Sequence, residues 1–278
     1  MSDIRIVNIC NNNCIYCLES SYRKKNKYES LDYIYFQIKE ISKNTDFLGI
    51  FGGNPLLHPN LLNILNYART QGINNISILT NTYKLDKNLI SDLEKNGLTG
   101  IGFYFNTFDK YTHELVSGGG IGYEELLKNI NLISKSDLSY KAIIHINKQN
   151  IENLYKDVFI LYKKFGVESF EFIGFFPFDK PYEKNNRNLL FLDYNNYRKS
   201  INKLFDVLDK IGVETHFIKF PRSFFGNYGK YYDYKFGVYE QLGKEDIQRL
   251  KKTEPYCKIE NRCKFCFLID YCNNEGIA

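Results

Sequence analysis

The sequence has no tryptophan, a single methionine at position 1, and no run of 18 or more apolar residues. A helix that crosses a bilayer needs about 20 such residues, so no membrane partner is expected. The first ten residues, MSDIRIVNIC, lack the charged and then apolar layout of a secretory signal. The cytoplasm is therefore the expected location.

The sequence also has no dense cluster of residues with the same charge. The formal net charge is +5, and the lysines are scattered along the chain. A solvated basic surface is expected rather than a nucleic-acid site. The chain has 278 residues, of which 44% are hydrophobic and 25% charged. This composition predicts a globular protein with one large domain, alone or with an appendage.

Cysteine is absent from the 239 residues between Cys17 and Cys257. Three cysteines lie within residues 10–17 and the other four within residues 257–272. In a reducing compartment, clustered thiols are more often metal ligands or catalysts than disulfides. Two separate metal sites are the simplest interpretation.

Short segments rich in Ile, Phe and Tyr alternate with amphipathic segments. The strands are predicted at residues 4–9, 47–51, 76–79, 100–105, 141–146 and 170–175, and helices at residues 61–71, 89–96, 123–134, 151–165 and 194–211. Repeated βα units imply parallel strands with right-handed crossovers. The predicted fold class is α/β: a partial (β/α)6 TIM-like barrel with a small cysteine-rich C-terminal extension. We place the barrel at residues 1–212 and the extension, which includes a strand near residues 213–220, at residues 213–278.

Polar, glycine and cysteine residues follow the predicted strands. In a parallel α/β barrel the reactive groups lie on loops at the carboxyl ends of the strands. The residues at these positions are Cys10, Gly52, Asn81, Asn106, Asn147 and Phe176. We therefore expect one shared site there.

The N-terminal cysteines have the spacing C-x3-C-x2-C, formed by Cys10, Cys14 and Cys17. Three thiolates on one tight loop can bind three irons of a [4Fe–4S] cube and leave the fourth iron open to a small bidentate molecule. The alternative is a structural zinc site, which usually needs four ligands. No fourth ligand is evident nearby.

With these cysteines the chain resembles the radical S-adenosylmethionine (SAM) superfamily, over roughly residues 4–178. Tyr16 stands at the aromatic position that the family places against the SAM adenine. Gly52-Gly53-Asn54-Pro55 is similar to the GGEP motif, whose backbone and acid receive the SAM amino group. Asn81 lies in a turn similar to the family's LTNG, and the segment that begins at Asn106 resembles the end of the fourth strand and the following helix.

The chain departs from the family pattern at three of these positions. Asn54 stands in place of the usual Glu, and an amide lacks the charge that strengthens a bond to an ammonium group. Thr82 replaces the usual Gly. Ser117 stands where related enzymes often carry an Arg. The resemblance implies that SAM is bound by Tyr16, Gly52, Gly53, Asn54, Pro55, Asn81, Asn106 and Ser117.

The C-terminal cysteines have the spacing C-x5-C-x2-C-x5-C, formed by Cys257, Cys263, Cys266 and Cys272. Four soft ligands could close a zinc site or a second iron–sulfur cluster. The last three resemble part of the SPASM or twitch extension of radical SAM enzymes. The resemblance implies one auxiliary [4Fe–4S] cluster at these four cysteines.

The resemblance implies an oxidoreductase that cleaves SAM to methionine and a 5′-deoxyadenosyl radical, which abstracts a substrate hydrogen. A flavodoxin- or ferredoxin-type protein is the expected reductant. The expected substrate is a peptide that receives a crosslink, a thioether or an oxidised residue. Against this, Cys10 lies so near the start that no leader-peptide-binding domain is expected before the barrel. The alternative substrate is a small molecule such as an aminocyclitol or sugar alcohol, oxidised by a dehydrogenase.

A hypothesis of another class is a non-catalytic iron–sulfur or zinc module that binds nucleic acid. It predicts no deoxyadenosine when the reduced protein meets SAM. His145, near the end of the fifth strand, either faces the substrate or packs in the core, and His113 is expected on an exposed helix with no role.

Overall fold

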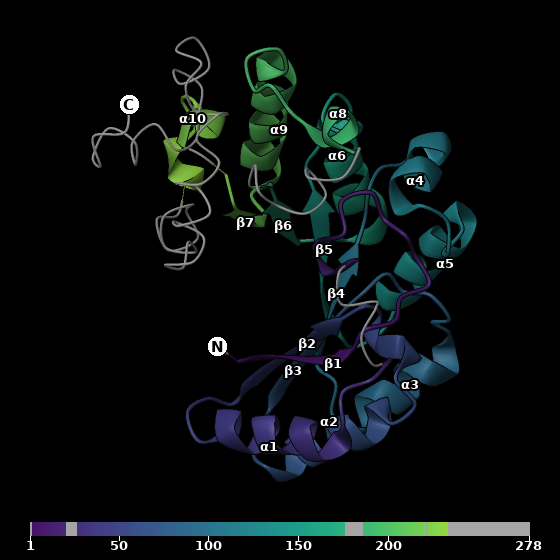
Figure 1. Ribbon diagram of the computed structural model, residues 1–278. Coiled ribbons are helices and arrows are strands. Elements are labelled where there is room, and N and C mark those ends of the chain that lie inside the picture. The colour runs from purple at the N-terminus through teal and green to yellow at the C-terminus, as the bar shows by residue number, and fades with distance from the viewer. Residues whose placement is uncertain (1, 21–26, 176–185, 221, 233–278) are drawn as a thin grey trace, which may run out of the picture. The chain divides into compact units, whose positions relative to one another are not determined.

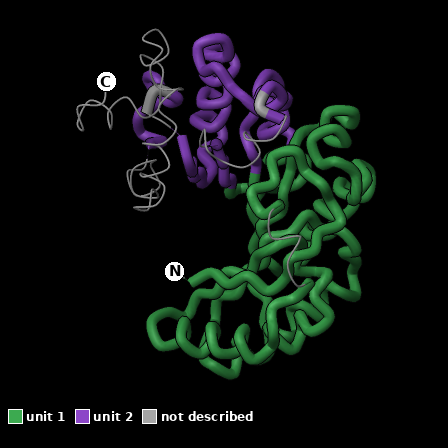
Figure 2. The backbone as a smooth tube through the Cα atoms, in the orientation of Figure 1, with its two compact units in different colours: residues 1–143, 161–169 green, residues 144–160, 170–278 purple. Residues whose placement is uncertain are grey.

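The computed structural model describes residues 2–20, 27–175, 186–220 and 222–232. The chain divides into two compact units, shown in different colours in Figure 2. The first comprises residues 1–143 and 161–169, and the second comprises residues 144–160 and 170–278. All of the N-terminal candidate site residues belong to the first unit.

Seven strands form a sheet whose order follows the chain. They are β1 (Asp3–Val7), β2 (Phe47–Gly52), β3 (Asn75–Thr80), β4 (Gly100–Tyr104), β5 (Ser139–His145), β6 (Ser169–Ile173) and β7 (Glu214–Ile218). The pairs from β1 to β5 are parallel, with Ile4 opposite Ile50 and Phe103 opposite Ala142. Parallel pairing brings the carboxyl ends of neighbouring strands to one edge, where the candidate residues lie.

Helices connect the strands of the first unit (Figure 1). They are α1 (Leu31–Ser42), the 3-10 helix η2 (Pro55–Leu57), α2 (Leu61–Thr70), α3 (Lys87–Lys95), α4 (Lys110–Ser117) and α5 (Tyr123–Ile133). Capping side chains start three of them, because Ser30, Asp86 and Asp109 each accept from the backbone N–H three residues on. Such caps satisfy N–H groups that a helix start leaves without a partner.

The first unit buries aliphatic side chains between its helices and the sheet. Ile34 and Ile38 of α1 and Ile64 of α2 are fully buried, as are Ile50 and Ile78 of the strands. Figure 1 shows α1 and α2 side by side, and α1 also contacts β1 and β2. This core fixes the strand ends that carry the site.

The second unit has an aromatic core. Its elements are part of α6 (Leu154–Phe165), α8 (Arg187–Leu190), α9 (Arg198–Ile211), α10 (Arg222–Phe225) and the 3-10 helix η3 (Gly229–Tyr231), with β6 and β7. Phe205 of α9 lies 5.4 Å from Phe217 of β7 between ring centroids, and Phe217 lies 4.8 Å from Phe172 of β6. Gly174 N donates to Ile218 O at 2.9 Å and aligns β6 with β7.

The predicted α/β class and all six predicted strands are confirmed. The structure differs in the count, because β7 joins the same sheet as a seventh strand, whereas the sequence placed it in the extension. Helix α1 was not predicted. The division at residue 212 stays a prediction, since most residues beyond it lie outside the described part of the chain.

Candidate functional site

The three N-terminal cysteines lie on the loop that leaves β1. Two backbone bonds hold this loop against the end of α4: Asn13 N donates to Ser117 O, and Ile15 N donates to Val116 O, both at 3.0 Å. At its far end Glu19 forms an ion pair with Arg5 of β1. The loop is thus anchored to the protein on either side of Cys14.

Two glycine turns lie in close contact with the backbone of this loop. A side chain at Gly53 would place its Cβ 1.9 Å from Ile9 O, directly before Cys10. At Gly118 the Cβ would lie 2.2 Å from Asn13 O, and Gly118 also has a positive φ of 63°. Only glycine permits both contacts. The cysteine loop therefore packs directly on the GGNP turn and on the GGG turn after α4.

None of the three cysteines is in a disulfide, and their thiols lie close enough to influence one another. Burial, and then the charges of Cys17 and Cys10, raise the pKa of the Cys14 thiol to about 12, although hydrogen bonds from Asn12 and Tyr16 act in the opposite direction. Such a thiol ionises at neutral pH only beside a cation, as when a metal binds it. The environment of Cys14 therefore fits a metal-bound thiolate.

Within the described residues, no three His, Cys, Asp or Glu side chains meet closely enough to share one metal ion. Zinc would draw its sulfur ligands to about 2.3 Å from a common centre. An iron–sulfur cube binds each thiolate to a different iron, so its ligands stand further apart.

Tyr16 lies within this loop and is buried. Its hydroxyl hydrogen-bonds the Cys14 thiol. Burial first, and then the negative charge of Cys14, raise the pKa of Tyr16 well above its usual value. The phenol therefore stays protonated and can donate to the Cys14 sulfur. Its predicted contact with adenine stays a prediction.

Four asparagine amides surround the cysteines. Asn54 Nδ2 donates to Asn81 Oδ1 at 2.9 Å and to Asn11 Oδ1 at 3.1 Å. Asn81 Nδ2 donates to Asn11 Oδ1 at 3.1 Å and to Cys10 Sγ at 3.7 Å. Asn12 Nδ2 donates to Cys14 Sγ at 3.8 Å. The structure thus brings the predicted residues Asn54 and Asn81 together beside Cys10.

Asn54 is fully buried, and its oxygen accepts from Thr80 Oγ1 at 2.7 Å and from Leu56 N at 3.3 Å. Both acceptor positions of the side chain are therefore used within the protein. Pro55 is buried at the start of η2. The predicted contact of Asn54 with the SAM amino group stays a prediction.

The other predicted SAM residues are placed as follows. Asn106 is buried directly after β4, and Ser117 is buried at the end of α4, where its hydroxyl donates to Glu114 O at 3.4 Å. Asn106 thus lies at the carboxyl edge of the sheet, and Ser117 lies beside the cysteine loop. Sequence reasoning missed Asn11 and Asn12, although both lie between Cys10 and Cys14, where ligand-orienting residues are common.

Thr82, at the turn after β3, has a φ of 67° and is fully buried. Its Oγ1 finds no hydrogen-bond partner in the described part of the chain. A branched side chain in the left-handed region costs about 1–2 kcal/mol, and an unsatisfied buried hydroxyl about 1–3 kcal/mol. The position is therefore strained, in agreement with the Gly that the family usually has there.

We expect Thr82→Gly to be more stable than the wild type by about 1 kcal/mol. Relief of the strain and of the buried hydroxyl outweighs the loss of about 0.5–1 kcal/mol of chain entropy and about 0.8 kcal/mol for the buried methyl group. Thr82→Ala, which keeps the Cβ, is the control and should gain less. Urea unfolding measures both, and a less stable Thr82→Gly would contradict this account.

Both histidines pack in the protein. His113 was expected to be exposed, but only 2% of its surface is accessible, and its ring lies 5.9 Å from that of Tyr123. Residues such as Tyr111 form the exposed face of α4 instead. His145 stacks on Phe175 at 5.5 Å, and burial, with the nearby Lys219, lowers its pKa to about 3. His145 is therefore a neutral core residue, as one of the two interpretations predicted.

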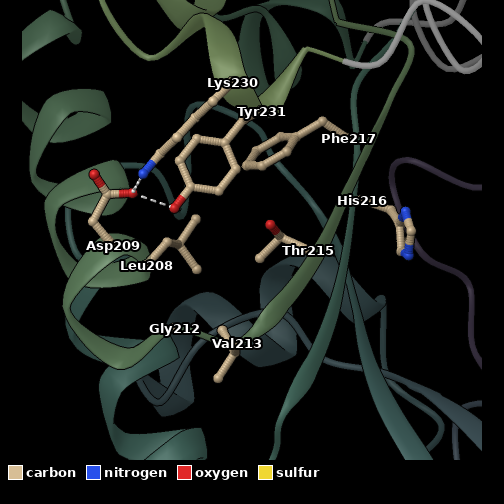
Figure 3. Close-up of a pocket in the computed structure, with 9 residues that line it drawn as sticks. All are labelled: Leu208, Asp209, Gly212, Val213, Thr215, His216, Phe217, Lys230 and Tyr231. Carbon is tan, nitrogen blue, oxygen red and sulfur yellow. Dashed lines mark hydrogen bonds and ion pairs between the residues drawn. The ribbon is translucent and has the colours of Figure 1, made fainter.

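The second unit contains a separate cavity of about 470 Å³ (Figure 3). Asp209 accepts from Lys230 Nζ at 2.7 Å and from the Tyr231 hydroxyl, and Phe217 and Thr215 line the opposite wall. None of the nine lining residues is a predicted site residue. This cavity therefore adds nothing to the cysteine site.

Two further predictions concern other parts of the chain. Among the described helices, none is long and apolar enough to cross a membrane. The four C-terminal cysteines lie outside the described residues, so the predicted auxiliary cluster stays a prediction.

Residues 4–159 match the model of the radical SAM superfamily. Curated relatives include a GTP 3′,8-cyclase of Haemophilus ducreyi, 28% identical over 147 residues, which are 50% of this chain and 42% of the relative. An AdoMet-dependent heme synthase of Methanosarcina barkeri is 24% identical over 170 residues, 60% of this chain and 48% of the relative. The chain spans under half the length of these relatives.

Solved structures show the same fold. SuiB of Streptococcus suis, bound to the precursor peptide SuiA, superposes with a TM-score of 0.63 at 15% identity, over 81% of this chain and 51% of that one. The structure of anSMEcpe with bound AdoMet gives 0.61 at 18% identity, over 77% of this chain and 64% of that one. The predicted α/β partial barrel is confirmed by this likeness.

The family uses a [4Fe–4S] cluster and SAM, and the three cysteines, the glycine turns and the amides described above lie inside the matched residues. This chain belongs to the radical SAM superfamily.

Proposed function

We propose that Cys10, Cys14 and Cys17 bind three irons of the [4Fe–4S] cluster and that SAM binds at the fourth. The observation that carries this proposal is the loop of three cysteines, none of them in a disulfide, packed between two glycine turns. When bound, the cluster supplies the electron that cleaves SAM to methionine and a 5′-deoxyadenosyl radical. The chain contributes the position and the dry surroundings of the reacting groups.

The residues around the loop bind different parts of SAM. The backbone of Gly52 and Gly53 receives the SAM amino group, because the Asn54 side chain is already used within the protein. Tyr16 lies against the adenine. Asn106 and Ser117 complete the SAM site with Pro55 and Asn81. These assignments follow the motifs, and the burial of all these side chains supports a site that excludes water.

A peptide is the proposed substrate. It is oxidised or crosslinked in a reaction that consumes SAM. Proteins of the same fold support this choice, since SuiB is seen with a precursor peptide and anSMEcpe with the Cp18Cys peptide. The auxiliary cluster proposed at Cys257, Cys263, Cys266 and Cys272 would accept the electron left on the substrate. A flavodoxin- or ferredoxin-type protein would supply the first electron.

A nucleotide is the second candidate substrate. The relatives named GTP 3′,8-cyclase or probable GTP 3′,8-cyclase are 25–30% identical to this chain and align with 40–50% of it. The alignments cover less than half of each relative's length, so they do not carry the substrate of these relatives over to this chain. For this reason the peptide remains the first choice.

The test is anaerobic. The reconstituted protein is reduced with dithionite and mixed with SAM, and 5′-deoxyadenosine is measured without substrate, with GTP, and with the synthetic peptide of any short reading frame found beside the gene. We expect deoxyadenosine in every case, and deuterium from a deuterated peptide in the nucleoside. Absence of deoxyadenosine would refute SAM cleavage, and deuterium transfer from labelled GTP alone would favour the nucleotide.

A further inference from the structure

Three buried asparagine amides near the cysteines have orientations that backbone N–H groups fix. A backbone N–H can only donate, so the atom that it meets must be the amide oxygen. Ile121 N donates to Asn12 Oδ1 at 2.9 Å, and Tyr83 N donates to Asn81 Oδ1 at 3.2 Å. Leu56 N does the same for Asn54. In each amide the NH2 group must therefore lie on the other side.

On that other side are the sulfur atoms. Asn81 Nδ2 lies 3.7 Å from Cys10 Sγ, and Asn12 Nδ2 lies 3.8 Å from Cys14 Sγ. Both asparagines are buried, so water does not compete for these donors. Cys10 and Cys14 thus each have one side-chain N–H directed at the sulfur. Such a hydrogen bond is stronger in a buried place than in water.

Asn54 acts one step further from the sulfur. Its Nδ2 donates to Asn81 Oδ1 at 2.9 Å, while Thr80 Oγ1 donates to Asn54 Oδ1 at 2.7 Å. A directional chain therefore runs from the Thr80 hydroxyl through Asn54 and Asn81 to Cys10. A carboxylate at position 54 could not donate to Asn81 and would break this chain.

We propose that Asn12 and Asn81 raise the reduction potential of the cluster by N–H···S hydrogen bonds to Cys14 and Cys10, and that Asn54 is a positioning residue that orients Asn81. The inference rests on the proposed function, namely that these cysteines bind the cluster. Hydrogen bonds to cluster sulfurs stabilise the added negative charge of the reduced state.

The step concerned is the uptake of one electron. The oxidised [4Fe–4S]²⁺ cluster becomes [4Fe–4S]⁺, the electron comes from a low-potential flavin or iron–sulfur protein, and no bond forms or breaks. The amides therefore make the cluster easier to reduce before SAM is cleaved.

The experiment is a redox titration of the reconstituted holoenzyme without SAM, followed by EPR. At the wild-type midpoint, we expect the ratio of reduced to oxidised cluster to be about threefold lower in Asn81→Leu and Asn12→Leu, which is a midpoint lower by about 28 mV at 59 mV per tenfold change for one electron. Asn54→Leu should shift the midpoint less and in the same direction. The double variant Asn54→Leu/Asn81→Leu should match Asn81→Leu, because the two act in series.

Asn129→Leu is the matched control. Asn129 is equally buried, but its Nδ2 donates to Thr82 O at 2.9 Å instead of to a sulfur. Its midpoint should equal that of the wild type. An equal shift in Asn129→Leu, or no shift in Asn81→Leu and Asn12→Leu, would overturn the inference.

A second measurement needs no variant. Wild-type protein carrying [δ-¹⁵N]asparagine is reduced and examined by pulsed EPR, and we expect a ¹⁵N coupling to the cluster from the side-chain amides. Its absence would overturn the inference, even where a variant fails to fold or to bind iron. Iron retained in Cys14→Ala would instead overturn the proposed function, so the two failures are distinguishable.

Discussion

Cys14→Ala is expected to abolish SAM cleavage and to remove about four irons per chain from the anaerobically reconstituted protein. Cys14 is the central thiol of the loop, and its environment leaves it protonated unless a cation binds, with a pKa of about 12. Two donors, Asn12 and Tyr16, are directed at its sulfur. Without this sulfur the iron at its corner has no protein ligand, and the remaining pair of cysteines cannot hold a cube.

The measurements are iron and sulfide counts and the yield of 5′-deoxyadenosine. Cys10→Ala and Cys17→Ala should behave alike, while the thermal unfolding of the apoprotein should change little, because the loop is anchored at Asn13, Ile15 and Glu19 rather than at the cysteines. Cleavage of SAM by Cys14→Ala would contradict the assignment.

The double variant Cys263→Ala/Cys266→Ala is the comparator. It keeps all three N-terminal thiols, so deoxyadenosine should still form. If the C-terminal cysteines hold an auxiliary cluster, iron falls from roughly eight to four per chain. Four irons in the wild type together with bound zinc would instead assign these cysteines to zinc.

Much of the fold follows from local pattern. Strands β1 to β6 are short apolar segments bounded by polar residues, and the motif residues follow their carboxyl ends, so parallel topology alone brings those residues to one edge. Helix α1 escaped prediction for a physical reason. Its inner face carries Ile34 and Ile38, but Tyr33 and Phe36 are 51% and 61% exposed on its outer face and obscure the apolar period.

The details of the site depend on contacts that no local pattern contains. Asn54 meets Asn11 across 43 residues, and Asn81 meets Cys10 across 71 residues. The sequence indicated that these residues share an edge, but not that the Asn54 amide faces another amide instead of a ligand. His113 shows the same limit, because only the tertiary fold places it against Tyr123.

Gly53→Ala should strongly destabilise the protein although it leaves all the cysteines in place. The new Cβ would lie 1.9 Å from Ile9 O, 2.4 Å from Ile9 C and 3.1 Å from Cys10 N. All three are backbone atoms, so no side chain can rotate away, and either the GGNP turn or the cysteine loop must move. Overpacking costs about 1–3 kcal/mol and at times more. We expect about 3 kcal/mol here, a fall in Tm of roughly 6–12 °C.

Gly229→Ala is the matched control, since nothing lies within 4 Å of its added Cβ and its φ is not in the left-handed region. It should stay within about 1 kcal/mol of the wild type. Because the displaced loop carries Cys10, Gly53→Ala should also bind less iron and cleave less SAM, whereas Gly229→Ala should keep both. Wild-type stability and iron content in Gly53→Ala would mean that the GGNP turn does not support the cysteine loop as the structure indicates. A loss of iron out of proportion to the loss of stability would show that this contact positions Cys10 for the cluster.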